Sequence, residues 1–178
     1  DVLFGDYNPA GRLPVTFYKS DSDLPDFSDY SMSNRTYRYF KGDALYPFGY
    51  GLSYTSFKYD QLSVPSKISK GKTITITVRV SNTGQKDGEE VSQLYISNIQ
   101  NKSPAPIRSL KGFQRIHLKK GERKIISFRL SPEQLSLINE KGAAYQPKGK
   151  LEVSAGGGQP GITHQTSSNT ISRFIEIL

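Results

Sequence analysis

The chain has 178 residues, enough for one ordinary domain or for a small domain with an appendage. It contains no cysteine, which excludes a disulfide framework, a thiol nucleophile and cysteine-ligated zinc. The net charge of +8 is unevenly placed along the chain. Residues 1–56 hold five Lys/Arg and seven Asp, for a net −2, whereas residues 57–178 hold nineteen Lys/Arg and nine Asp/Glu, for a net +10.

The basic residues of the second part are scattered singly along segments that resemble strands. Their tightest group, residues 117–124, spans a turn and is interrupted by Glu122. A site for nucleic-acid bases would also need exposed aromatic rings among these charges, and this group contains none. We therefore predict a solvated basic face and no nucleic-acid partner. Because no apolar run is long enough to cross a bilayer, we also predict no membrane span.

Residues 1–56 are divided by many turns that Pro and Gly mark. Only Leu13–Tyr18 and Arg35–Phe40 have a pattern that permits short strands. So long a segment without a core of its own is unusual in a compact domain. We therefore expect this segment to lie against another body.

The residues offer no metal, cofactor or catalytic site. Aspartates gather between residues 21 and 29, but their spacing lacks a calcium-loop signature and Pro25 interrupts it, so a solvated acidic loop is favoured. His117 reads as a surface strand residue and His164 lies in a loop rich in Gly, Ser and Thr. The adjacent Glu89 and Glu90 should point to opposite faces of a strand and cannot cooperate in acid–base chemistry.

The stretch YPFGYGLSYTSF at Tyr46–Phe57 concentrates aromatic side chains in what looks like a connection. We predict that its rings bury area on the bodies at either side and form an interdomain interface. Gly49 and Gly51 should permit a close approach of two backbones. Without its neighbours, we expect the segment 1–56 to be poorly packed, domain-swapped or covered by another copy. The predicted interface residues are Tyr46, Phe48, Tyr50, Tyr54 and Phe57.

From Phe57 onward the sequence is typical of an all-β fold, with alternating apolar residues and a turn every eight to twelve residues. The pattern predicts a sandwich of about seven strands, of immunoglobulin or fibronectin type III class. One short helix is expected at Ser131–Leu137, after a capping serine and a proline. Phe113 and Phe128 are expected in the core. The expected strands are 57–64, 74–80, 89–97, 110–118, 125–130, 149–155 and 171–178.

Six segments in this order resemble family 3 glycoside hydrolases, which are β-glucosidases and β-xylosidases. FGDYNPAGRLPVTF at Phe4–Phe17 is similar to the end of that family's α/β sandwich domain, and RTYRYF and LYPFGYGLSYTSF are similar to the segments that follow it. VRVSNTGQKDGEEVSQLYIS, LKGFQRIHLKKGE and FRLSPEQL resemble the family's C-terminal fibronectin type III-like domain. The resemblance therefore implies two parts: residues 1–56, the tail of the α/β domain plus a connector, and residues 57–178, the fibronectin type III-like domain.

The resemblance implies a retaining exo-acting β-glycosidase that hydrolyses terminal sugars of plant polysaccharide oligomers. Its two catalytic carboxylates would lie about 5–5.5 Å apart. In the family both come from segments that would lie upstream of Asp1, so no catalytic residue is expected in this chain. It implies a buttressing module that is inactive alone, with the upstream catalytic domains and an oligosaccharide as partners. It also implies a secreted or periplasmic enzyme. The sequence NRTYRY favours the xylosidase branch over the glucosidase branch.

Arg35, Tyr37 and Arg38 are the candidates for contact with a sugar, because Arg can bond hydroxyl groups and Tyr offers a stacking face. The alternative for these three residues is structural packing between domains. Two other functions for the whole chain stay open. One is an independent polysaccharide-binding module that uses exposed rings, and the other is a cell-surface adhesion module.

Overall fold

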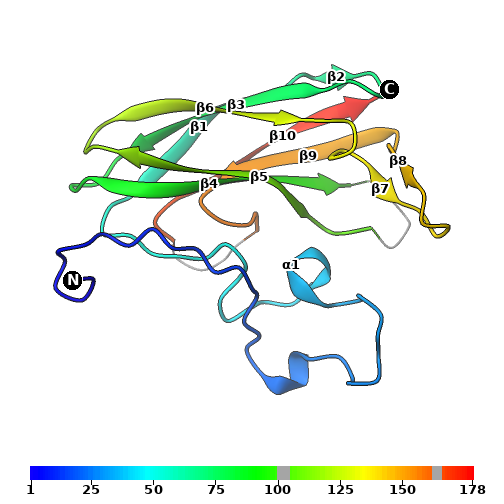
Figure 1. The fold of residues 1–178 in the computed structure, drawn as a ribbon, viewed down its shortest axis with the longest axis horizontal. Coiled ribbons are helices and arrows are strands. Elements are labelled where there is room, and N and C mark those ends of the chain that lie inside the picture. The colour runs from blue at the N-terminus through cyan, green and yellow to red at the C-terminus, as the bar shows by residue number, and fades with distance from the viewer. Residues whose placement is uncertain (100–104, 162–165) are drawn as a thin grey trace.

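The computed structural model describes residues 1–99, 105–161 and 166–178, so His164 lies outside the described residues. The first 56 residues, which we call the connector, carry only two short helical turns, η1 (Asp21–Asp23) and α1 (Thr36–Tyr39). All strands lie in the second part (Figure 1). Their bounds are β1 (Phe57–Ser63), β2 (Lys67–Ile68), β3 (Ile74–Asn82), β4 (Gly88–Asn98), β5 (Ser109–Leu118), β6 (Arg123–Leu130), β7 (Leu137–Ile138), β8 (Ala144–Tyr145), β9 (Gly149–Gly156) and β10 (Thr170–Ile177).

The strands form two facing sheets, which confirms the predicted β-sandwich (Figure 1). One sheet has the order β1-β3-β6, and the other has the order β2-β10-β9-β4-β5. Neighbouring strands are antiparallel, except for the two-residue parallel pairing of β2 with β10. A small separate hairpin joins β7 and β8. In the described parts of the chain, no helix is long and apolar enough to cross a membrane.

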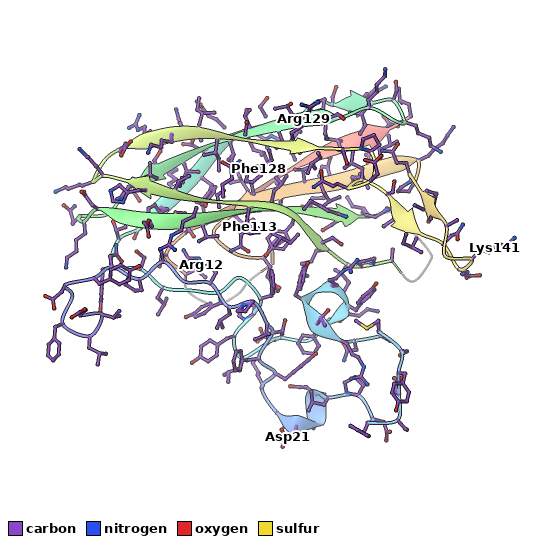
Figure 2. The ribbon with its side chains drawn as sticks, in the orientation of Figure 1. Arg12, Asp21, Phe113, Phe128, Arg129 and Lys141 are labelled. Atoms are coloured by element: carbon purple, nitrogen blue, oxygen red, sulfur yellow. The ribbon has the colours of Figure 1, made fainter. Side chains whose placement is uncertain are left out.

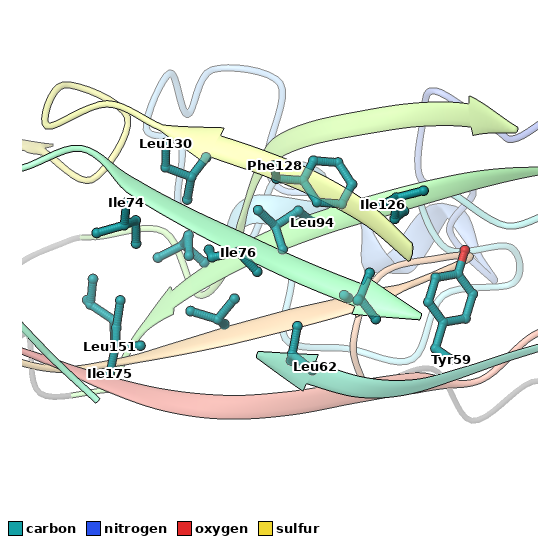
Figure 3. Packing of buried hydrophobic residues seen from close by; sticks show 14 of the residues in the cluster. Tyr59, Leu62, Ile74, Ile76, Leu94, Ile126, Phe128, Leu130, Leu151 and Ile175 are labelled. Atoms are coloured by element: carbon teal, nitrogen blue, oxygen red, sulfur yellow. The ribbon is translucent and has the colours of Figure 1, made fainter. Parts of the chain in front are cut away.

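The core lies between the two sheets and follows the alternation of the sequence (Figure 3). In β3, Ile76, Val78 and Val80 are fully buried, while the residues between them face outward. Strand β4 contributes Leu94, which is likewise fully buried. Removing apolar surface from water is the main force that holds such sheets together. The half-buried strand pattern therefore predicted the packed face of β3 correctly.

Three expectations for local structure are wrong. Arg35–Phe40 is not a strand: Phe40 N donates to Thr36 O (2.9 Å), which closes the helical turn α1. Leu13–Tyr18 contributes only one isolated bridge, from Phe17 to Tyr46. Ser131–Leu137 is not a helix but a turn, in which Leu135 N bonds Pro132 O (3.2 Å). After this turn the backbone of Leu137 pairs with Tyr145 in the hairpin of β7 and β8. The backbone groups used in this strand pairing are not available for continued helical hydrogen bonds.

The expectation for Phe113 is also wrong, whereas Phe128 is a core residue as predicted. Phe113 is 67% exposed, and Phe128 is 5% exposed. The adjacent Gly112 explains the difference, because an added Cβ there would lie 2.9 Å from the Phe128 ring. The inward position on β5 therefore belongs to the glycine, beneath a ring from the opposite sheet. Since side chains alternate along a strand, Phe113 must point to the outer face of the sheet, in agreement with its exposure.

The connector lies beside the five-stranded sheet, on the side of the sandwich away from the three-stranded sheet (Figure 1). Its two arms run next to each other: Gly49 N donates to Leu13 O (2.8 Å) and Leu13 N to Tyr50 O (2.9 Å). Phe17 N donates to Tyr46 O (2.8 Å) in the same way. The two arms, around residues 13–17 and 46–50, are thus hydrogen-bonded to each other, and the connector lies along one side of the sandwich.

Candidate functional site: the junction of connector and sandwich

A buried ion pair joins the connector to the sandwich. Arg12, in the first arm, places its Nη2 2.6 Å from Oε2 of Glu90, and its Nε donates to the carbonyl of Gly157 (3.1 Å) (Figure 2). The exposed fractions of the two side chains are only 6% and 0%. Glu90 occupies an inward position of β4, on the same face of the strand as Ser92 and Leu94. A buried charge is tolerated only when it is paired and hydrogen-bonded, so Arg12 is the partner that this carboxylate requires.

The second oxygen of Glu90 is held from the opposite sheet. Tyr59 of β1 donates its hydroxyl to Glu90 Oε1 (2.9 Å), and its ring closes the end of the core (Figure 3). Burial raises the pKa of the Glu90 carboxyl, and the charge of Arg12 and the hydrogen bond from Tyr59 oppose that rise. Burial, followed by the charge of Glu90, raises the pKa of the Tyr59 phenol well above its usual value. Tyr59 therefore acts as a permanent donor, and the trio ties both sheets to the connector.

A second polar contact is made by Gln93, which is 3% exposed on the outer side of β4. Its Nε2 donates to Gly157 O (2.9 Å) and to Gly49 O (3.3 Å), and its Oε1 accepts from Tyr95 (2.5 Å). Gly49 has φ +77°, and a Cβ there would lie 2.3 Å from Gln93 Oε1. A Cβ at Gly51 would lie 2.2 Å from the carbonyl oxygen of Gly11. The close backbone approach predicted for Gly51 is confirmed, whereas the neighbour that excludes a side chain at Gly49 is the amide of Gln93.

Aromatic stacking forms the third contact. The Tyr37 ring lies parallel to Phe48, with centroids 4.1 Å apart, and meets the edge of Tyr95 at 6.2 Å. The Tyr37 hydroxyl accepts a hydrogen bond from Leu110 N (3.1 Å) at the start of β5. Stacked and edge-on rings at these separations are favourable arrangements for aromatic pairs. Tyr37 therefore docks α1 on the sandwich.

The other two candidates for sugar contact have different surroundings. Arg35 bonds the backbone carbonyls of Ser31, Asp26 and Asp29, and so orders the acidic loop. Arg38 lies over the Tyr39 ring (5.7 Å) and lines a hollow of about 260 Å³ that Lys111 also lines. Burial, followed by the charge of Arg38, lowers the pKa of Lys111. The three candidates therefore face different groups and do not converge on one pocket.

The predicted interface rings divide into two groups. Phe57 is 3% exposed and belongs to the sandwich core, while Phe48 and Tyr50 are half-buried. Tyr46 and Tyr54 are 44% and 47% exposed. An apolar groove of about 620 Å³, which we call the ring groove, opens on the connector. It is lined by Pro9, Gly11, Arg12, Leu13, Phe17, Tyr46, Tyr50, Gly51 and Leu52.

The carboxylates do not form an acid–base pair. Glu89 faces outward, where it pairs with Arg115, whereas Glu90 faces inward, so the predicted opposition of these two side chains is confirmed. Within the described ranges, no group of three or more His, Asp or Glu side chains could hold a metal ion. The sequence did not predict the bond between Arg12 and Glu90. The feature that could have indicated it is Glu90 itself, a charged residue at an inward position of a strand, because a buried charge requires a partner.

Two family descriptions match the chain. The glycosyl hydrolase family 3 C-terminal domain matches residues 1–54, and the fibronectin type III-like domain matches residues 90–159. A xylan 1,4-beta-xylosidase of Xylanibacter ruminicola is 47% identical over 157 residues, which is 88% of this chain and 18% of that protein. A periplasmic beta-glucosidase of Salmonella typhimurium is 40% identical over 170 residues, covering 88% of this chain and 22% of that protein.

Solved structures give the same result. The beta-D-glucoside glucohydrolase of Trichoderma reesei superposes with a TM-score of 0.83 at 27% identity, covering 100% of this chain and 28% of that one. A β-glucosidase of Erythrobacter marinus has a TM-score of 0.80 at 32% identity, covering 99% of this chain and 23% of that one. The chain thus spans about a fifth to a quarter of the length of these proteins. It belongs to family 3 of the glycosyl hydrolases and corresponds to their C-terminal domain and fibronectin type III-like domain.

Proposed function

We propose that this chain is a non-catalytic module of a retaining exo-acting β-glycosidase and that it buttresses the catalytic domains of that enzyme. The observation that carries this proposal is the ring groove. Phe17, Tyr46 and Leu52 are 46%, 44% and 55% exposed, and together they offer a continuous apolar surface. A soluble protein rarely leaves such a patch uncovered unless another surface packs on it. The upstream catalytic domains of the same enzyme are the partner we propose.

The junction supports this role, because it makes the connector a stiff mount. Arg12 and Gln93 fix the two arms of the connector to the sandwich through buried polar contacts. A Gly/Ser linker, in contrast, would leave the two bodies free to move. We therefore propose a functional boundary after residue 56. Residues 1–56 contact the catalytic domains, and residues 57–178 form the sandwich that holds residues 1–56 in place.

We further propose a β-xylosidase rather than a β-glucosidase. The relative named as a xylosidase is 47% identical to this chain, and the relative named as a periplasmic beta-glucosidase is 40% identical. The second name also supports a secreted or periplasmic enzyme. Among the three candidates for sugar contact, Arg38 keeps its side chain at the edge of a hollow, and we propose it as the one that approaches substrate. Arg35 and Tyr37 we propose as packing residues.

The experiment that tests this function is hydrolysis of 4-nitrophenyl β-xyloside and β-glucoside. We expect no turnover by the purified 178-residue chain, because the two catalytic carboxylates of a retaining glycosidase are proposed to lie in the upstream domains. The protein encoded by the full reading frame that contains the chain should hydrolyse the xyloside with a higher kcat/KM than the glucoside. Turnover by the purified chain would contradict the non-catalytic role. A higher kcat/KM for the glucoside would contradict the sugar preference alone.

An independent module that binds polysaccharide through exposed rings is less well supported. Phe113 on β5 and Phe174 on β10 are 67% and 59% exposed. Strands β9 and β4 lie between β10 and β5, so the two rings belong to strands about 14 Å apart at the usual strand spacing. They form no adjacent pair on which a sugar chain could stack. The adhesion alternative has no observation of its own.

A further inference from the structure

The outer face of the three-stranded sheet is basic at one end. In the strand register, Lys58 of β1 lies opposite Ser81 of β3, which in turn lies opposite Arg123 of β6. The next row contains Asp60 and Arg79. This face points away from the connector, as Figure 1 shows, so a partner bound at the ring groove does not cover it.

These residues line a hollow of about 560 Å³, which we call the basic hollow. The turn between β3 and β4 and the turn between β5 and β6 form its rim. Every lining residue is polar or glycine, and four cations stand against one carboxylate. The lining residues are Lys58, Asp60, Arg79, Ser81, Asn82, Thr83, Gly84, Gln85, Lys120, Gly121 and Arg123.

The single carboxylate is already used within the sheet. Asp60 holds Arg79 through two hydrogen bonds, of 2.6 Å from Nε and 2.9 Å from Nη2. Among the described residues, the side chains of Lys58, Lys120 and Arg123 have no hydrogen-bonding or ion-pairing partner. The pKa of Asp60 is lowered first by its bond from Arg79 and further by the charges of Lys58 and Arg123. The described lining of the hollow therefore carries four positive charges and one negative charge, an excess of three positive charges.

The rim of the hollow is rigidly held from below. Asn82 is 2% exposed, and its Nδ2 donates to the carbonyls of Lys86 (2.8 Å) and Leu118 (3.1 Å). Its Oδ1 accepts from Thr55 Oγ1 (2.7 Å) and from Gly84 N (3.1 Å). Two of these bonds lie within the turn between β3 and β4, one reaches the end of β5, and one reaches the connector. The cations are thus mounted on a fixed frame, which lowers the entropy lost when a ligand binds.

We propose that the basic hollow binds a carboxylate-bearing sugar, namely a uronic acid unit of an acidic plant polysaccharide. The proposal rests on the proposed function as a β-xylosidase module, because the relative named a xylan 1,4-beta-xylosidase points to a polysaccharide as the source of the substrate. Arg123 offers a planar fork that matches a carboxylate, and Lys58 and Lys120 supply point charges beside it. The polar groups of Ser81, Thr83 and Gln85 are suited to sugar hydroxyls.

The lining of the hollow argues against two other polyanions. Nucleic-acid sites use aromatic rings on which bases stack, and the basic hollow has none. A lipid surface would be met by apolar side chains beside the cations, and the lining has none of these either. A sugar acid requires cations and hydrogen-bonding groups only, which is the composition observed.

The test is affinity electrophoresis of the intact 178-residue chain in gels that contain polygalacturonate, neutral arabinoxylan or DNA. We expect retardation by polygalacturonate at low salt and a dissociation constant raised about tenfold or more in K120E/R123E. K120Q/R123Q should lose part of this affinity. The control K141E/K148E changes net charge equally, at exposed lysines away from the hollow, and should bind like the original chain; Lys141 lies at the far end of the sandwich (Figure 2).

Circular dichroism melting must give the same Tm for all variants, which is expected because the four side chains are exposed. Failure of the original chain to bind polygalacturonate would overturn the proposal. Equal loss in the control would also overturn it, since binding would then follow net charge alone. Tighter binding to DNA than to polygalacturonate would overturn the choice of a sugar acid. None of these outcomes alters hydrolysis by the full reading frame, so the proposed function is tested separately.

Discussion

Replacing Arg12 with alanine is expected to lower the free energy of unfolding of the chain by about 3–5 kcal/mol at neutral pH. The change leaves the carboxylate of Glu90 buried without its cation, at 0% exposure. The loss of the ion pair should also loosen the connector, which lets water reach Glu90 and limits the loss of stability. A loosened connector should be cleaved faster by a protease at residues 1–56. Urea denaturation followed by circular dichroism measures the first effect, and limited trypsin digestion measures the second.

The loss caused by R12A should depend on pH in a defined direction. Without Arg12, the pKa of Glu90 rises further, because the largest influence opposing its burial is removed. Below both folded-state pKa values the carboxyl is neutral in either protein, and the charge penalty disappears. The difference in stability should therefore be small in acid and grow as pH rises through the folded pKa of Glu90. A difference independent of pH would contradict a role through the buried charge.

The neighbouring ion pair supplies the matched control. Glu89, on the outer side of β4, pairs with Arg115 of the neighbouring β5, and the two side chains are 35% and 55% exposed. Exposed ion pairs contribute little to stability, so R115A should leave the denaturation midpoint nearly unchanged. Equal losses in R12A and R115A would show that burial is not the deciding factor.

Replacing Gly49 with alanine is expected to cost about 3 kcal/mol. Part of the cost is the positive φ of +77°, which an L side chain rarely adopts. The remainder arises because the new Cβ would lie 2.3 Å from Gln93 Oε1 and would displace a buried amide from its partners. Thermal or urea unfolding of G49A measures the total loss.

Gly71 separates the two causes, because it has φ +74° and nothing within 4 Å of an added Cβ. G71A should therefore cost only the backbone strain, about 1–2 kcal/mol. The extra loss in G49A reports the contact between the connector and β4. If G49A and G71A are equally destabilised, the connector does not depend on the Gln93 contact.

The sandwich was predictable from the sequence because its strands obey a simple alternation. Ile76, Val78 and Val80 recur at every second position and lie in the core. The same rule failed on β5, where it could not tell which of Gly112 and Phe113 faces inward. That choice depends on Phe128 of the opposite sheet, which occupies the space above the glycine. Contacts between residues distant in sequence leave no local pattern.

The connector was harder to predict for the same reason. Gly157 is buried, and its carbonyl accepts bonds from Arg12 and Gln93, which are distant from it in the sequence. Tyr37 was a candidate for sugar contact, but its ring packs between Phe48 and Tyr95. The sequence gives the ring-rich composition of this segment. Which rings face the sandwich and which stay exposed is decided by the sheet beneath them.

The ring groove is the surface on which we propose that the catalytic domains pack. Hydroxyl-radical footprinting of the isolated chain and of the full reading frame tests it, with Phe17 and Tyr46 as probes at 46% and 44% exposure. Ile125 of β6, at 71% exposure on the outer face of the three-stranded sheet, serves as the internal reference. We predict strong modification of both probes in the isolated chain and their protection in the full protein, while Ile125 is modified equally in both. Equal modification of Phe17 and Tyr46 in the two proteins would contradict the account.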